Sequence, residues 1–142
     1  MERSEAVSSG WVAARWRPAF GAAVASEFAG LIHLAFAREH LHEWVPFGLF
    51  FLASGLFQVV WAVMVFSPQP RAFFAVGLVV NVATVILWAV TRTTGLPIGP
   101  EHWTPEAVGA PDVAASILEL LIVVGCVWIL GADRRSGRTA TY

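Results

Sequence analysis

Residues 39–43 read EHLHE and hold two of the four histidines of the chain, each beside a glutamate. Glu39 and His42 are three residues apart, as are His40 and Glu43, and this spacing places each pair on one face of a helix. Imidazole and carboxylate groups without thiolates suit a divalent metal such as Zn, Fe, Mn or Cu. Di-iron bundles use the same Glu-x-x-His spacing, but they need it twice, and this chain has it only here.

Two further pairs of titratable residues repeat a seven-residue spacing. His33 lies seven residues before His40, and Glu119 lies seven residues after Asp112. On an α-helix such residues differ by about 20° in direction and about 10 Å along the axis. If the two helices are antiparallel, His33 is level with Glu119 and His40 with Asp112. The predicted metal ligands are therefore His33, His40, Asp112 and Glu119, with Glu43 or His102 closing the site.

Structural interpretations of the same residues stay open. EHLHE can be a solvated helix end, and His33 and Glu119 can be a buried hydrogen-bonded pair that fixes the register of two helices. A deeper polar layer is also expected, in which a protonated Glu27 shares hydrogen bonds with Gln58 and Asn81. Titratable residues rarely face lipid, so these side chains should all point into the protein.

The elements that position these residues are four long apolar blocks. The chain is 57% hydrophobic and only 13% charged, against about 25% charged residues in soluble domains. Blocks over about 18–37, 45–66, 72–91 and 113–132 are long enough to cross a membrane. Their apolar residues are continuous rather than alternating, which favours helices over barrel strands. The sequence predicts an all-α, integral membrane four-helix bundle that forms one domain over residues 1–142.

The arginines predict the orientation of this bundle. Two of the nine, Arg38 and Arg92, fall on one side, and seven fall on the other: Arg3, Arg15, Arg17, Arg71, Arg134, Arg135 and Arg138. Because cytoplasmic loops are enriched in positive charge, both termini should be cytoplasmic. EHLHE and the Pro-rich segment 91–111 should then face outward from the plasma (inner) membrane. The A-F-A sequence at 35–37 resembles a signal cleavage site, but Glu27 and His33 argue against a passive signal.

Several classes of function are disfavoured. The single cysteine, Cys126, excludes an internal disulfide and a Cys-rich metal site. The chain has no G-x-S-x-G, P-loop or dinucleotide motif, and neither haem nor nucleotide is expected. A net charge of −1 gives no reason to expect nucleic acid.

Three functions remain. The preferred one is a metal-binding membrane protein that handles the metal or uses it on a lipid or small apolar substrate. The second is a proton-linked carrier or channel that acts as a homo-oligomer, with Glu27, His33 and Glu119 as relay groups. The third is an accessory subunit of a larger membrane complex, in which the polar residues are structural.

Overall fold

In the computed structural model of the chain, the backbone is described for residues 2–139 and the side chains for residues 16–132. The described part contains four helices, which are α1 (Glu2–Glu43), α2 (Val45–Met64), α3 (Arg71–Thr93) and α4 (Ala110–Thr139). Each includes a segment long and apolar enough to cross a membrane, and in α1 that segment is Trp16–Glu43. The prediction of an all-α chain with four such helices is confirmed.

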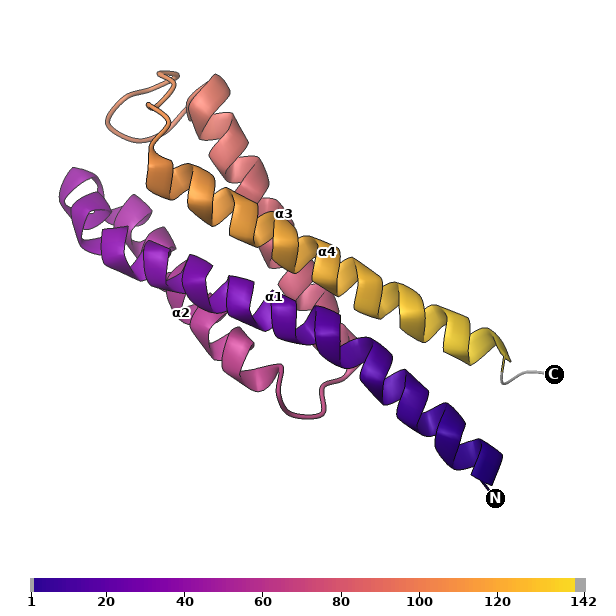
Figure 1. Cartoon of the computed structure of the whole chain (residues 1–142). Coiled ribbons are helices and arrows are strands. Elements are labelled where there is room, and N and C mark those ends of the chain that lie inside the picture. Colours follow the sequence, from indigo (N-terminus) through magenta and orange to yellow (C-terminus); the bar gives the residue numbers. More distant parts are fainter. Residues whose placement is uncertain (1, 140–142) are drawn as a thin grey trace.

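The helices alternate in direction along the bundle (Figure 1). The α1–α2 link at Trp44 and the α3–α4 loop, residues 94–109, lie at one end, which we call the loop end. Both termini and the α2–α3 link, residues 65–70, lie at the opposite end, which we call the terminal end. α1 packs against α2 and α4, and α3 packs against α4.

The helix boundaries differ from the predicted ones at the loop end. α1 continues through EHLHE to Glu43, and only Trp44, with φ −161° and ψ 124°, separates it from α2. Residues 37–43 contain neither Gly nor Pro, so nothing in them ends the helix. Pro46 lies in the first turn of α2, where its missing N–H costs nothing. His33 and His40 therefore lie on one continuous helix.

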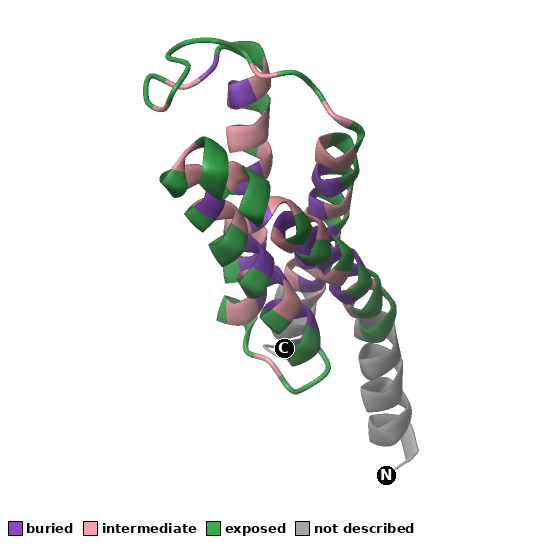
Figure 2. Ribbon diagram, turned by 90° about the vertical axis from the view of Figure 1, so that its left-hand side faces the viewer, coloured by how far each residue is buried: buried purple, intermediate pink, exposed green. Residues whose placement is uncertain are grey.

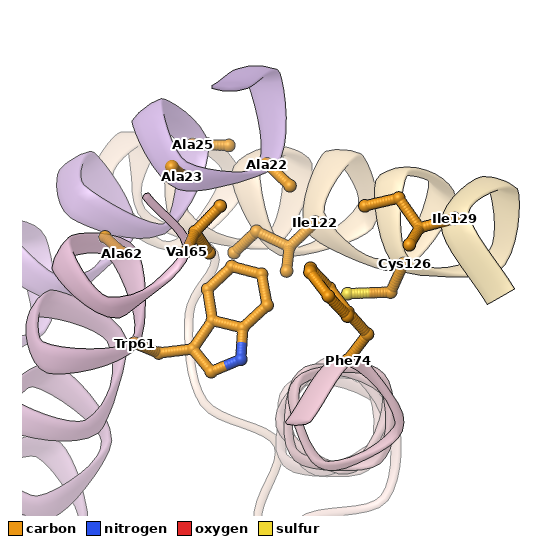
Figure 3. Packing of buried hydrophobic residues seen from close by; sticks show 10 residues of the cluster. All are labelled: Ala22, Ala23, Ala25, Trp61, Ala62, Val65, Phe74, Ile122, Cys126 and Ile129. Carbon is orange, nitrogen blue, oxygen red and sulfur yellow. The ribbon is translucent and has the colours of Figure 1, made fainter. Parts of the chain in front are cut away.

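Packing in the terminal half of the bundle is centred on Trp61 (Figure 3). Its ring stacks on Phe73 with centroids 5.2 Å apart, and its Nε1 donates a hydrogen bond to the Phe73 carbonyl oxygen at 3.3 Å. Gly77 admits the indole, because a Cβ there would lie 2.7 Å from the ring. The buried cluster comprises Ala22, Ala23, Ala25, Trp61, Ala62, Val65, Phe74, Ile122, Cys126 and Ile129.

Small residues bring α1 and α2 close together nearer the middle. A Cβ at Gly30 would lie 2.9 Å from the carbonyl oxygen of Gly55, so the two backbones approach more closely than larger residues would allow. The buried residues face the interior of the bundle and the exposed ones face outward (Figure 2). Many of the exposed side chains are large and apolar, as in Phe28, Val79 and Trp128. Such a surface suits contact with a lipid bilayer.

The arginines with described side chains separate between the two ends. Arg17 and Arg71 lie toward the terminal end, whereas Arg38 and Arg92 lie toward the loop end. Five arginines used in the orientation prediction lie outside the described side chains: Arg3, Arg15, Arg134, Arg135 and Arg138.

Candidate functional site

Four polar side chains, one from each helix, meet near the middle of the bundle. Gln58 of α2 is fully buried, and its Oε1 lies 2.8 Å from Nδ1 of His33 on α1. Its Nε2 donates to Oδ1 of Asn81 on α3 at 3.1 Å and to Oε1 of Glu119 on α4 at 3.2 Å. We call His33, Gln58, Asn81 and Glu119 the polar layer. Every helix is tied to the others through Gln58.

The hydrogen bonds of the polar layer indicate where protons lie. Because Oε1 of Gln58 accepts, Nδ1 of His33 carries a proton. Nε2 of His33 then faces Oε1 of Glu119 at 3.7 Å, which is beyond hydrogen-bonding distance. A shift of roughly 1 Å would bring the two atoms into range. The pair can then share one proton, or both groups can contact one bound molecule.

The structure brings together His33 and Glu119, as the seven-residue spacing predicts, but it does not form a separate layer around Glu27. Side chains on a helix lean toward its N-terminus, so Gln58 reaches toward the loop end, away from the level of its own backbone. That backbone is level with Ser26, whose Oγ donates to the Gln58 carbonyl oxygen at 2.8 Å. Glu27 is partly exposed, and among the described side chains it bonds to neither Gln58 nor Asn81.

The predicted pair of His40 and Asp112 has other partners. His40 Nδ1 lies 2.7 Å from Oε2 of Glu43, its neighbour one helical turn later. Asp112 Oδ2 accepts from Nη2 of Arg92 at 2.9 Å. His40 and Asp112 nevertheless line the same cavity. His102 is exposed in the α3–α4 loop and lies apart from the polar layer.

Arg92 is the residue that sequence reasoning missed, because it served only to predict orientation. Its side chain is 10% exposed. Nη1 pairs with Glu106 of the α3–α4 loop, and Nη2 pairs with Asp112 of α4. The spacing held a signal, since residues 81 and 92 are eleven apart and eleven residues complete slightly more than three helical turns. Arg92 therefore shares a helix face with Asn81.

A cavity of about 270 Å³ separates the polar layer from the α3–α4 loop. His33, Glu119 and Thr84 line its inner end, and Arg92 and Asp112 line its end near the loop. The walls between are mainly apolar and aromatic, formed by residues that include Phe36, Phe47, Phe50, Phe51, Leu87 and Trp88. The cavity is therefore apolar along its length and polar at both ends.

A second, more polar hollow of about 650 Å³ adjoins the cavity at the loop end, and we call it the outer cleft. The two share Arg92, Asp112 and His40 in their linings. Glu39 and Glu101 also line the outer cleft. Acidic side chains therefore lie on the approach to the cavity from the loop end.

Two buried N–H groups at the cavity have no hydrogen-bond partner among the described residues. They are Nε1 of Trp88 and Nε of Arg92. Both residues belong to α3 and both line the cavity. Neither atom can accept a hydrogen bond, so each requires an acceptor.

Metal binding gains no support from this geometry. The described residues contain no group of three or more His, Cys, Asp or Glu that could hold a metal ion. His33 and Glu119 offer two ligands, while His40 and Asp112 are directed to Glu43 and Arg92. The metal site therefore stays a prediction.

Comparison of the chain with protein-family models, with curated proteins and with solved structures found no match. Its function has to be inferred from the geometry of the polar layer and the cavity.

Proposed function

We propose that the chain is an integral membrane protein that binds a small, mainly apolar molecule in the cavity near its loop end. The polar layer would hydrogen-bond one end of this ligand, and the aromatic walls would contact its body. One observation carries the proposal: His33 and Glu119, although almost fully buried, line the inner end of an apolar cavity.

The proposed setting follows from the helices and the arginines. Four helices are long and apolar enough to cross a bilayer, and their outward surfaces are rich in large apolar side chains. The terminal end contains most of the arginines in sequence, which favours a cytoplasmic location for both termini. The cavity would then lie in the outer half of the plasma (inner) membrane.

The cavity volume limits the size of the ligand. An apolar cavity of about 150 Å³ in another protein is large enough to bind benzene, and pockets for drug-sized molecules begin near 300 Å³. At about 270 Å³, this cavity fits a molecule of about two fused rings or a short branched chain.

A purely structural role explains the polar layer less well. Polar residues at this depth are expensive, and they mark functional sites by default. The terminal half shows how this chain closes a bundle by packing alone, since Ile122, Cys126 and Ile129 are fully buried there. Next to the polar layer the chain leaves space and lines it with aromatic rings. That difference favours a binding site over a structural pair.

Filling the cavity tests the proposal. Ala115 lines the cavity and is buried, whereas Ala114, its neighbour on α4, is exposed on the bundle surface. Wild type, Ala115→Phe and Ala114→Phe would be purified from native membranes, and bound small molecules would be extracted and identified by mass spectrometry. We expect a molecule enriched with wild type and Ala114→Phe and absent from Ala115→Phe. Identical extracts from all three proteins would refute a ligand in this cavity.

The other functions stay predictions that can be tested separately. Elemental analysis of the wild type beside His33→Ala and Glu119→Ala tests metal binding, which requires near-stoichiometric metal that both variants lose.

A channel is disfavoured by the apolar cluster around Trp61, which fills the bundle between the polar layer and the terminal end. Isolation of a stable complex from membranes would support an oligomer or an accessory subunit.

A further inference from the structure

We infer that the ligand is uncharged and presents an oxygen acceptor, such as a ketone carbonyl, to Trp88 Nε1 and Arg92 Nε at the loop end of the cavity. This inference rests on the proposed function, and it adds the chemical class of the ligand and the position of its polar group.

Two donors at the loop end of the cavity have no acceptor among the described residues. Tryptophan and arginine side chains only donate hydrogen bonds, so the buried Nε1 of Trp88 and Nε of Arg92 both require an acceptor. Leaving a buried donor unsatisfied is destabilising. The two donors belong to residues one helical turn apart on α3, and both residues line one cavity, so a ligand in the cavity is the nearest source of an acceptor.

The charged side chains around Arg92 limit the charge of the ligand. The Arg92 guanidinium already pairs with two carboxylates, Glu106 and Asp112, so this end of the cavity has an excess of negative charge. Glu43 and Glu101 of the outer cleft add to it. An anionic ligand would be repelled by these carboxylates. A cationic group would be attracted by the carboxylates, but an ammonium has no lone pair to accept from the two N–H groups, so a neutral acceptor fits best.

The distance between Trp88 and the polar layer sets the length of the ligand. Trp88 lies seven residues after Asn81 of the polar layer, which is about 10 Å nearer the loop end on a helix. A ligand that reaches both ends therefore has an apolar body of one or two rings between its polar group and the polar layer. Both donor atoms are buried. We expect the Trp88 ring to turn about its side-chain bonds when it binds the acceptor.

Matched probes can test this inference on the full chain in detergent. The probes are 2-acetylnaphthalene, 2-isopropenylnaphthalene, in which a CH₂ group replaces the carbonyl oxygen, and the anion 2-naphthoate. Cys126 is the only cysteine and is 0% exposed, so its reaction with a fluorogenic maleimide during heating reports unfolding. The increase in stability against unfolding with rising probe concentration then gives the Kd of each probe. Ala115→Phe, with the cavity filled, corrects for partition of the probes into detergent.

We expect the ketone to bind wild type about two- to tenfold more tightly than the hydrocarbon, the range of one net hydrogen bond. Trp88→Phe should abolish this advantage. Trp103→Phe should retain it, because Trp103 is exposed in the α3–α4 loop and does not line the cavity. The infrared carbonyl stretch of the bound ketone should move to lower frequency in wild type. This second measurement does not depend on the folding of Trp88→Phe.

The outcomes separate the inference from the proposed function. Equal affinity for ketone and hydrocarbon in wild type would overturn the inference and indicate that water satisfies the donors. If 2-naphthoate binds most tightly, the inference that the ligand is neutral is wrong. If Trp88→Phe still binds the ketone more tightly than the hydrocarbon, the inference that the acceptor binds at Trp88 is wrong. If no probe stabilises wild type more than Ala115→Phe, the cavity does not bind such molecules and the proposed function fails.

Discussion

Gln58 links three partners that come from the three other helices. Its side chain contacts His33, Asn81 and Glu119, and its backbone carbonyl accepts from Ser26. Side-chain hydrogen bonds inside membrane proteins contribute about 0.6 kcal/mol each on average. Three of them amount to roughly 2 kcal/mol, a large share of the stability of a small protein.

Replacing this glutamine should therefore destabilise the bundle. We expect Gln58→Leu to lose about 2 kcal/mol of unfolding free energy, because three buried polar groups lose a partner at once. Unfolding in a denaturing detergent, followed by Cys126 labelling, measures the change. Gln69→Leu is the control, since Gln69 is the other glutamine and its side chain bonds to the carbonyl of Met64 at the end of α2 and to Ser67 of the α2–α3 link. A loss below about 0.5 kcal/mol for Gln58→Leu, the size of an ordinary surface change, would contradict this account.

At the residue scale, helical spacing predicted one pair correctly and placed another group in the wrong layer. His33 and Glu119 meet because seven residues bring a helix back to nearly the same direction. Glu27 was grouped with Gln58 by counting backbone positions, which ignores the lean of the Gln58 side chain. The Arg92 pairs depend on how the loop folds back, and loop conformation is not set by periodicity.

Helix packing in this bundle depends on glycine at particular positions. A Cβ at Gly30 would meet the Gly55 carbonyl and the Val59 side chain at 2.9 Å, whereas a Cβ at Gly21 meets nothing within 4 Å. Both glycines belong to α1, so they differ in surroundings rather than in helix propensity.

We therefore expect opposite effects from the same substitution. Gly30→Ala should destabilise the protein by about 1–3 kcal/mol, because α1 and α2 have to move apart. Gly21→Ala should be neutral or stabilising by up to about 1 kcal/mol, the gain in helix propensity. Thermal unfolding of both variants under one detergent condition compares them. Equal midpoints for the two variants would show that the α1–α2 contact is not tight.

The α3–α4 loop is held to the helices by ion pairs of Arg92. Glu106 of the loop pairs with it, whereas Glu101 of the same loop is exposed and forms no ion pair with the described side chains. Trp103, between the two glutamates, is 64% exposed.

Loosening this loop should raise its cleavage by chymotrypsin after Trp103. An ion pair of this exposure contributes up to about 1 kcal/mol, so Glu106→Gln should be cut as much as about fivefold faster. Glu101→Gln should be cut at the wild-type rate. Mass spectrometry of the fragments over time identifies the cleavage site. Equal rates for both variants would mean that Arg92 does not restrain the loop.

At the element scale, the four helices follow from apolar blocks of sufficient length. The extent of α1 did not follow, because the charges of EHLHE suggested a link, while the absence of Gly and Pro allowed the helix to continue. The irregular α3–α4 loop was predicted from its prolines and glycines, and Gly95 and Gly99 adopt the positive φ values that glycine favours.

The whole molecule is divided along its axis into regions of different polarity. From the terminal end they are the apolar cluster around Trp61, the polar layer, the cavity, and the α3–α4 loop with the outer cleft. Composition predicted a bundle with polar edges turned inward. It did not predict a cavity, because the volume of a cavity depends on how far apart the helices lie near the loop end.

The proposed orientation makes a prediction for intact cells. We expect Glu101→Cys to react with a membrane-impermeant maleimide from outside and Gln69→Cys to react only after permeabilisation, because the two residues lie at opposite ends of the bundle. Native Cys126 is fully buried and should give little background. Labelling of Gln69→Cys alone from outside would establish the reverse orientation.

The position of Arg92 also bears on how fast a ligand could exchange. A molecule that arrives through the outer cleft has to pass between Arg92, Glu106 and Asp112, which join the loop to α3 and α4. Arrival and departure would then cross the same barrier. Weakening the ion pair to Glu106 would speed association and dissociation together and leave their ratio unchanged. The residence time of the ligand would be controlled by the loop, and its equilibrium affinity by the walls of the cavity.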